Sequence, residues 1–400
     1  MEIDEQQLQH IQAVLDEAVS SQKFAGNSCL VYQGGKIRGF WASGFSRKEG
    51  KMAFARDTIC RIFSMTKPVT SAAAWILIER GKIDLASPVS DFLSEFKNLS
   101  VCDGEKIVPC RKPLLVRDLR NMTSGYSYGG FQDESHRQIS VLIAELDGAL
   151  KKGNPISTAE LVSRAAKIPL SFAPGERFEY GISADILGAL IEKAAGMSLG
   201  AFFKAEIFDK LGMNDTAFFV PREKSNRTAN VYEQIFDGEQ RSLKLRTDSI
   251  LGIPNEIDCA PAFESGGAGL WSTVDDYMRF CRMLVNGGEL DGVRILQRNT
   301  VRAMHTLHIS GAAQAAFEEG LPQLSGYSYG NLMRILTDES KSTTITRGNS
   351  EFGWDGALGT YMAVDSANDT AIVFFTQCAN DGGYTSTARK IKNIVYSALL

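Results

Sequence analysis

The sequence has few of the residues that usually build metal centres or disulfide frameworks. Its 400 residues include seven cysteines and four histidines. The cysteines are odd in number and lack C-x-x-C spacing, which argues against a zinc site or a disulfide scaffold. His305 and His308 have helical spacing, but no cluster of cysteines or carboxylates accompanies them. We therefore expect reduced thiols and no metal site.

Long apolar runs and an excess of basic residues are also missing. The longest apolar run, residues 72–78, is far too short to span a bilayer. A net charge of −4 gives no basic surface for nucleic acid. Residues 1–5 are acidic where a secretory signal needs a basic segment followed by an apolar one. We expect a cytoplasmic protein without nucleic acid or membrane partners, and no cofactor motif is present.

The composition is that of a soluble globular enzyme-sized protein. Hydrophobic residues make up 44% and charged residues 22% of the chain. At 400 residues the chain is too long for one simple core, so a composite domain or two lobes is expected.

Hydrophobic periodicity indicates that both ends of the chain contribute to one α/β layer. Helical spacing of apolar residues predicts helices at 5–20 and 386–400. Two β-hairpins are predicted, one at 28–42 around Gly34-Gly35 and one at 360–376.

The middle of the chain differs in character. Helices are predicted at 65–80, 158–167, 183–195, 198–211 and 273–286, the last opened by a capping box at Ser272 and Asp275, whereas 221–258 is polar and irregular. The expected fold class is α/β (α+β), an antiparallel sheet flanked by N- and C-terminal helices plus an inserted, mainly helical lobe. We assign 1–70 and 265–400 to the sheet domain and 71–264 to the lobe, with an active site between them.

Ser-x-x-Lys occurs three times in the sequence, and the surroundings distinguish the copies. Ser20/Lys23 and Ser94/Lys97 lie in polar stretches that indicate solvated surface. Ser64 instead opens a helix that is apolar nearly all round, as in a protein core.

Lys67 lies one helical turn after Ser64 and therefore on the same face. Desolvation lowers the pKa of a lysine, and a neutral amine can take a proton from a serine hydroxyl. The helix N-terminus also favours negative charge that develops at the serine. From the motif alone, a capping serine with an extended surface lysine remains an equal alternative.

The Gly-x-Ser-x-Gly pattern of another hydrolase class occurs twice, around Ser127 and around Ser328. That pattern needs a buried strand before the serine and a helix after it, and its histidine follows the serine along the chain. Ser127 lies between polar segments, and no histidine follows Ser328. We interpret both matches as coincidental.

Four further segments resemble the sequence motifs of one protein family. They are LRNMTSG at 119–125, PGERFEY at 174–180, GAGLWST at 267–273 and FGWDGALGT at 352–360. With Ser64 and Lys67, these segments make the chain resemble the serine β-lactamase/penicillin-binding superfamily, in its class C β-lactamase-like branch with family VIII esterases. The family fold, an antiparallel sheet plus a helical lobe, agrees with the predicted elements.

The resemblance implies a role for each matching residue. Ser64 would be the nucleophile, and Lys67 and Tyr180 would share the proton transfers, with a phenolate as general base beside the lysine cation. The backbone N–H groups of Ser64 and Ala357 would form the oxyanion hole.

The departures from the family pattern concern the substrate. The Tyr-x-Asn motif of β-lactamases is here Tyr180 followed by Gly181 and Ile182, and the Lys-Thr-Gly motif is here Trp354, Asp355 and Gly356. The lysine that would pair with a substrate carboxylate is missing, which disfavours penicillin.

We therefore expect a serine hydrolase that acts on small-molecule esters or related acyl substrates. Trp354, Asp355, Gly356 and Ile182 are the expected substrate-binding residues. The alternatives are a β-lactamase or D-amino-acid-specific peptidase or amidase, an acyltransferase, and an inactive penicillin-binding sensor. Asp355 would bind an amine-bearing substrate or stabilise a turn.

Overall fold

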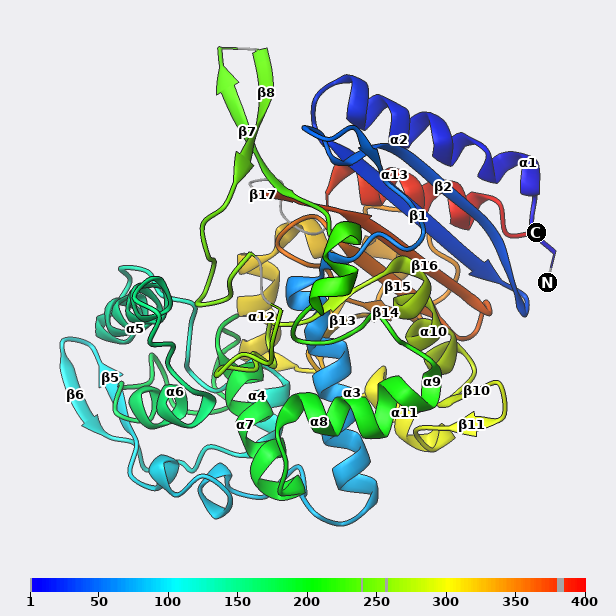
Figure 1. The fold of residues 1–400 in the computed structure, drawn as a ribbon. Coiled ribbons are helices and arrows are strands. Elements are labelled where there is room, and N and C mark those ends of the chain that lie inside the picture. The colour runs from blue at the N-terminus through cyan, green and yellow to red at the C-terminus, as the bar shows by residue number, and fades with distance from the viewer. Residues whose placement is uncertain (1, 239, 256–257, 380–384) are drawn as a thin grey trace.

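An eight-stranded antiparallel sheet forms the centre of the computed structural model, which describes residues 2–238, 240–255, 258–379 and 385–400 (Figure 1). The strand order is β12-β13-β14-β15-β16-β1-β2-β3. The strands are β1 (Gly26–Gln33), β2 (Lys36–Arg47), β3 (Met52–Ala53), β12 (Tyr327–Gly330), β13 (Met333–Leu336), β14 (Glu351–Gly353), β15 (Tyr361–Asp365) and β16 (Thr370–Thr376). Strands from the two ends of the sequence meet where β1 pairs with β16.

The central strands of the sheet carry apolar side chains on both faces, and helices cover both of these faces. In β1, Cys29 and Val31 face one core while Leu30 and Tyr32 face another. The first core holds the terminal helices α1 (Glu5–Leu8), α2 (His10–Ser20) and α13 (Ser386–Ser397), which lie together over one face (Figure 1). Helix α10 (Val274–Val285) packs on the other face against β1 and β16.

The remaining helices lie mostly between the two groups of strands in the sequence. They are α3 (Thr66–Glu79), α4 (Val116–Arg120), α5 (Glu134–Lys151), α6 (Thr158–Ala165), α7 (Ser183–Ala195), α8 (Leu199–Phe203), α9 (Asp209–Leu211), α11 (Arg298–Met304) and α12 (Gly311–Gly320). Smaller strands pair as β4 (Cys60–Arg61) with β9 (Trp271–Ser272), β5 (Ser100–Asp103) with β6 (Lys106–Pro109), β10 (Glu289–Leu290) with β11 (Val293–Arg294), and β7 (Val231–Asp237) with β8 (Gln240–Arg246) and β17 (Cys378–Ala379). Helix α3 is buried almost throughout, as its apolar sequence predicts.

The predicted fold class, both predicted hairpins and the C-terminal helix are confirmed. The predicted helix at 198–211 is divided by a π-helical turn at Lys204–Phe208. The capping prediction for α10 was wrong by one residue, because the Thr273 side chain accepts the bond from the Asp276 N–H.

Several elements were missed by the sequence analysis, among them α5 and the hairpin of β7 and β8. Helix α5 was overlooked because its first turns are polar, although Ile139, Leu142 and Leu146 are buried at helical spacing. The stretch expected to be irregular contains β7 and β8, a hairpin that projects from the body of the molecule (Figure 1). Few of the hairpin's residues are buried, so the alternation that marks a strand is weak there.

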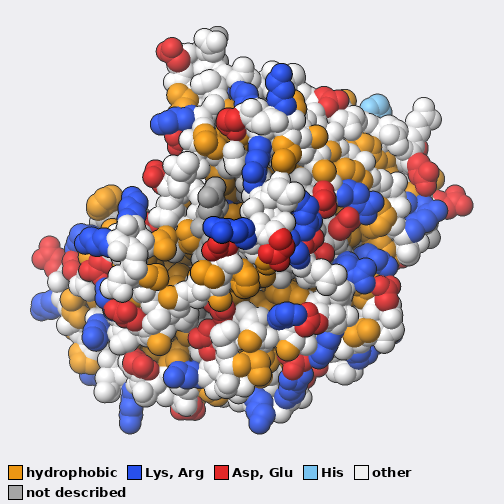
Figure 2. Space-filling view, in the orientation of Figure 1, with side chains coloured by type: hydrophobic (Ala, Val, Ile, Leu, Met, Phe, Trp, Pro, Cys, Tyr) orange, Lys and Arg blue, Asp and Glu red, His pale blue; other side chains and the backbone are white. Residues whose placement is uncertain are grey.

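Charged side chains of both signs are interspersed on the face shown in Figure 2, without an extended field of one sign. Among the described residues, no single helix is long and apolar enough to cross a membrane. Helix α7 and the segment Leu199–Leu211 meet that criterion only as a pair, which is bent by 75°.

The C-terminal helix is predicted to contribute strongly to stability through Ile391, which is fully buried against the sheet. Replacing Ile391 with Ala should lower the free energy of unfolding by about 2–4 kcal/mol, because the cavity does not refill. Urea unfolding followed by circular dichroism measures the change. The matched control is Lys390→Ala on the exposed side of the same helix, which should cost about 1 kcal/mol or less. Equal effects of the two substitutions would contradict the assigned packing of α13.

Candidate active site

Ser64 lies in a short 3₁₀ turn, Phe63–Met65, that leads directly into α3. The preceding residue, Phe63, has a φ of +43°, a left-handed conformation that is strained for a side chain of this size. The turn is tied down by the Tyr277 hydroxyl, which donates to the Met65 carbonyl at 2.6 Å. The surrounding structure thus holds the serine at a fixed place at the N-terminal end of a buried helix.

The Lys67 amine is fully buried and contacts three oxygen atoms. Its Nζ lies 3.1 Å from Ser64 Oγ, 3.1 Å from Tyr128 Oη and 2.8 Å from the Gly267 carbonyl oxygen. Burial lowers the pKa of Lys67 to about 7, and the carboxylates of Asp185 and Asp355 only partly oppose this shift. A neutral amine has two N–H groups for Gly267 and Tyr128 and one lone pair that is left to accept from the Ser64 hydroxyl.

Tyr180 lies beside this pair in the loop that precedes α7. Its ring centroid is 4.7 Å from Lys67 Nζ, and its hydroxyl accepts a hydrogen bond from Trp354 Nε1 at 2.9 Å. Burial raises the pKa of Tyr180, although hydrogen bonds with Ser64 and Trp354 work in the other direction. The expected resting phenolate is therefore not favoured. In the free enzyme the phenol keeps its proton and the amine of Lys67 is the group that is poised to lose one.

Two further tyrosines belong to the site and were missed by the sequence analysis. Tyr128 bonds to Lys67, and its ring lies 5.6 Å from that of Tyr180. Tyr329 packs edge-on against Trp354 at 5.0 Å. Each is the second tyrosine of a GYSYG segment, at 125–129 and 326–330. The repeated segment could therefore have pointed to these two tyrosines as site residues, rather than to its serines.

The serines of those segments have local structural roles. Ser127 Oγ accepts from the Gly129 N–H at 3.0 Å. Ser328 Oγ donates to the Ile309 carbonyl at 3.1 Å from within β12. These contacts agree with the interpretation that both matches to the nucleophile pattern are coincidental.

The segment Trp354, Asp355 and Gly356 follows β14 and packs against Ile62, just before the turn that contains Ser64. A Cβ on Gly356 would lie 2.3 Å from the Ile62 carbonyl oxygen, so only glycine allows this close approach. The next residue, Ala357, is exposed. The oxyanion hole formed by the N–H groups of Ser64 and Ala357 stays a prediction.

Asp355 is engaged by the protein itself. Its carboxylate lies 3.5 Å from a guanidinium nitrogen of Arg334, a residue that is completely buried beneath it. Its backbone also forms a β-bridge with Tyr361. These contacts favour the turn-stabilising role over the binding of an amine-bearing substrate.

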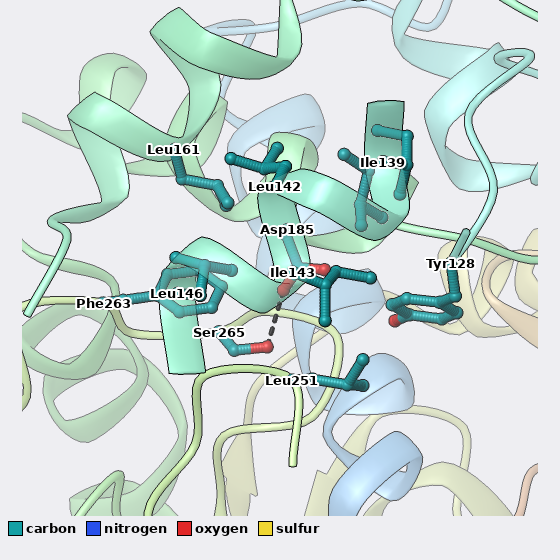
Figure 3. A pocket seen from close by; sticks show the side chains of 11 residues that line it. Tyr128, Ile139, Leu142, Ile143, Leu146, Leu161, Asp185, Leu251, Phe263 and Ser265 are labelled. Carbon is teal, nitrogen blue, oxygen red and sulfur yellow. Dashed lines mark hydrogen bonds between the residues drawn. The ribbon is translucent and has the colours of Figure 1, made fainter. Parts of the chain in front are cut away.

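Ile182 occupies the N-cap position of α7 without a side-chain capping bond. It is buried and lines a pocket next to the site. The pocket is small, because the space in it that is open to water-sized molecules is about 20 Å³, enough for one or two waters. Its walls are mainly apolar side chains of α5, with Tyr128 at one end and Asp185 at its back (Figure 3). An isoleucine here extends the apolar wall and offers no hydrogen bond to a substrate amide.

Comparisons with known proteins agree with this geometry. A family model described as Beta-lactamase matches residues 11–395. The chain is 31% identical to the uncharacterized protein MT1414 of Mycobacterium tuberculosis, over 92% of this chain and 90% of that protein. It is 26% identical to the esterase EstB of Burkholderia gladioli, over 97% of this chain and 94% of that protein. The solved structure of EstCE1, a hydrolase with promiscuous acyltransferase activity, superposes with a TM-score of 0.81 at 25% identity, covering 98% of this chain and 99% of that one.

The reactivity of Ser64 should depend on pH through Lys67. Only the neutral amine accepts the serine proton, so labelling of Ser64 by a fluorophosphonate should rise through one ionisation with a midpoint near pH 7. Below that pH the amine is protonated, and the rate should fall about tenfold for each pH unit. Intact-protein mass spectrometry over a pH series measures the rate. A midpoint near 10.5, the pKa of a free lysine, would contradict the desolvated amine.

Proposed function

This chain belongs to the beta-lactamase family, and from that premise we propose that it cleaves neutral carboxylic esters through an acyl-enzyme on Ser64. Its family, its fold class and its nature as a serine hydrolase are as the sequence analysis predicted. The similarity to an esterase along nearly the whole chain supports esters as the substrate class. The observation that carries the proposal is the contact between a buried amine of lowered pKa, Lys67 Nζ, and Ser64 Oγ.

Acylation follows from the resting protonation states. Lys67 takes the proton of Ser64 as Oγ bonds to the ester carbonyl carbon, which gives a tetrahedral intermediate. When the C–O bond to the alcohol breaks, the leaving oxygen takes the phenol proton of Tyr180. The acyl-enzyme then contains an ammonium on Lys67 beside a phenolate on Tyr180. The ammonium lies within 4.7 Å of the Tyr180 ring, where it stabilises this charge.

Deacylation reverses the proton movements. The Tyr180 phenolate removes a proton from water, whose oxygen attacks the acyl carbon. As the bond to Ser64 breaks, Oγ takes the proton from the Lys67 ammonium, and all three groups return to their starting states. The phenolate expected from the family resemblance thus occurs in the intermediate rather than in the free enzyme.

The substrate should be uncharged near the scissile bond. Trp354 occupies the place of the lysine that would pair with a carboxylate, and Ile182 occupies the place of the asparagine. Of the described cations near the site, Arg334 is buried and paired with Asp355 and Glu351. An anionic group on the substrate would therefore lose its hydration without gaining a partner.

Acyl transfer to an alcohol is the second candidate function. The structural similarity to EstCE1, described as a hydrolase with promiscuous acyltransferase activity, favours it. Chemically it needs only that an alcohol replaces water as the proton donor to the Tyr180 phenolate. Adding a primary alcohol to an ester hydrolysis reaction and quantifying the new ester separates the two outcomes.

Replacing Ser64 with Ala should abolish turnover of p-nitrophenyl butyrate. We expect a loss in kcat on the order of 10⁴-fold or more, because no other group can carry the acyl intermediate. Release of p-nitrophenol measures turnover, and intact-protein mass detects the acyl adduct.

Ser328→Ala is the matched control, because Ser328 is buried and its hydroxyl bonds to the backbone carbonyl of Ile309. Full activity in Ser64→Ala would overturn the assignment of the nucleophile, and Ser127 would be the next serine to replace. A stable benzylpenicillin adduct on Ser64 without ester turnover would instead indicate a penicillin-binding sensor.

The neutral-substrate proposal predicts discrimination between two esters of the same length. The p-nitrophenyl monoester of succinate carries a carboxylate where p-nitrophenyl butyrate carries a methyl group. We expect kcat/KM for the anionic ester to be roughly tenfold lower or worse, because its charge is unpaired in the site. Trp354→Lys should reduce this difference. An anionic ester that is cleaved as well as the neutral one would contradict the proposal.

A further inference from the structure

Asp185 is a buried carboxylate close to the site to which the sequence analysis gave no role. It lies in the first turn of α7, five residues after Tyr180, and is 4% exposed. Its Oδ1 accepts a hydrogen bond from Ser265 Oγ at 2.6 Å, drawn in Figure 3, and one from the Gly267 N–H at 3.1 Å. Burial raises the pKa of Asp185, whereas both hydrogen-bond donors and the charge of Lys67 favour its ionised form.

The same Gly267 connects Asp185 to the catalytic lysine. While the Gly267 N–H donates to Asp185, its carbonyl oxygen accepts from Lys67 Nζ at 2.8 Å. A Cβ on Gly267 would lie 2.8 Å from Tyr128 Oη and 2.9 Å from Asp185 Oδ2, so these two oxygen atoms converge on this glycine. The neighbouring Gly266 carbonyl is fixed by the Thr70 hydroxyl at 2.7 Å. The hydrogen-bonded segment 265–267 therefore fixes the position of the Asp185 carboxylate relative to the Lys67 amine.

We propose that Asp185 is a positioning residue for Lys67: its carboxylate holds the Gly267 carbonyl against the amine, and its charge favours the ammonium form that the acyl-enzyme requires. This role rests on the proposed function, in which Lys67 gains a proton during acylation. Asp185 does not touch the reacting atoms and acts through the amine alone.

Other charged and titratable groups face Lys67 from several elements. Tyr128 and Tyr180 contribute phenols whose pKa values are raised by burial, so they are neutral in the free enzyme. Asp355 acts from the loop after β14 and raises the pKa of Lys67, but its charge is offset by Arg334 of β13 at 3.5 Å. Asp185 is held by a neutral hydroxyl and a backbone N–H, so its charge reaches Lys67 without such an offset.

The substitution Asp185→Asn removes the charge and retains an oxygen that accepts from Ser265 and Gly267. We expect the pH midpoint of Ser64 labelling by a fluorophosphonate to move lower by roughly one pH unit, because the amine then loses its proton more readily. Asp185→Glu, which keeps the charge, should restore a midpoint near that of the wild type. If Asp185→Asn does not fold, as judged by thermal unfolding, the neutral Asp185→Thr, with a side chain of similar volume, replaces it with the same expected shift.

Asp118→Asn is the matched control, since Asp118 is equally buried and is also held by a backbone N–H and a hydroxyl, but in α4. It should leave the midpoint unchanged. An unchanged midpoint in the folded Asp185→Asn protein, or an equal shift in Asp118→Asn, would overturn the proposed role of Asp185 and leave the function standing. Failure of the wild type to label at Ser64 would instead refute the proposed function.

Discussion

The chemistry of this protein depends on the burial of a single amine. A lysine in water is charged at neutral pH and cannot accept a proton. Burial removes Lys67 from water and lowers its pKa, and the carboxylates of Asp185 and Asp355 oppose this shift only in part. Its pKa of about 7 is the balance of those opposing effects. The order of proton transfers in the proposed function follows from that balance.

The rest of the fold keeps this amine dry and in place. Helix α3 is buried on almost every side, so the chain cannot relax to bring water to Lys67. The sheet contributes the β14 loop with Trp354, and beneath that loop lies a cluster of fully buried charges, Arg334, Glu351 and Lys392. Such a cluster is costly to break, because removing one member leaves an unpaired charge in the interior.

Aromatic residues surround the site, and in the proposed function they favour uncharged substrates. Trp354 bonds to Tyr180 and packs against Tyr329, so it restrains the catalytic phenol while it replaces a cation of the related β-lactam-binding sites. One substitution therefore alters both the polarity of the site and the surroundings of a catalytic group. The small pocket behind Tyr128 has mainly apolar walls, with the carboxyl group of Asp185 at its back.

The sequence alone was sufficient for the fold class, the two hairpins and the pairing of Ser64 with Lys67, because these depend on local periodicity and on helical spacing. From Trp354 and Ile182 it also predicted a site for neutral substrates, which stays a prediction. Only the tertiary structure showed that Tyr128 contacts Lys67 and that Asp185 is linked to it through Gly267, because these residues lie far from Lys67 in the chain. It also decided the resting protonation of Tyr180, because a pKa depends on burial and on neighbouring charges, and neither is defined until the segments have packed together.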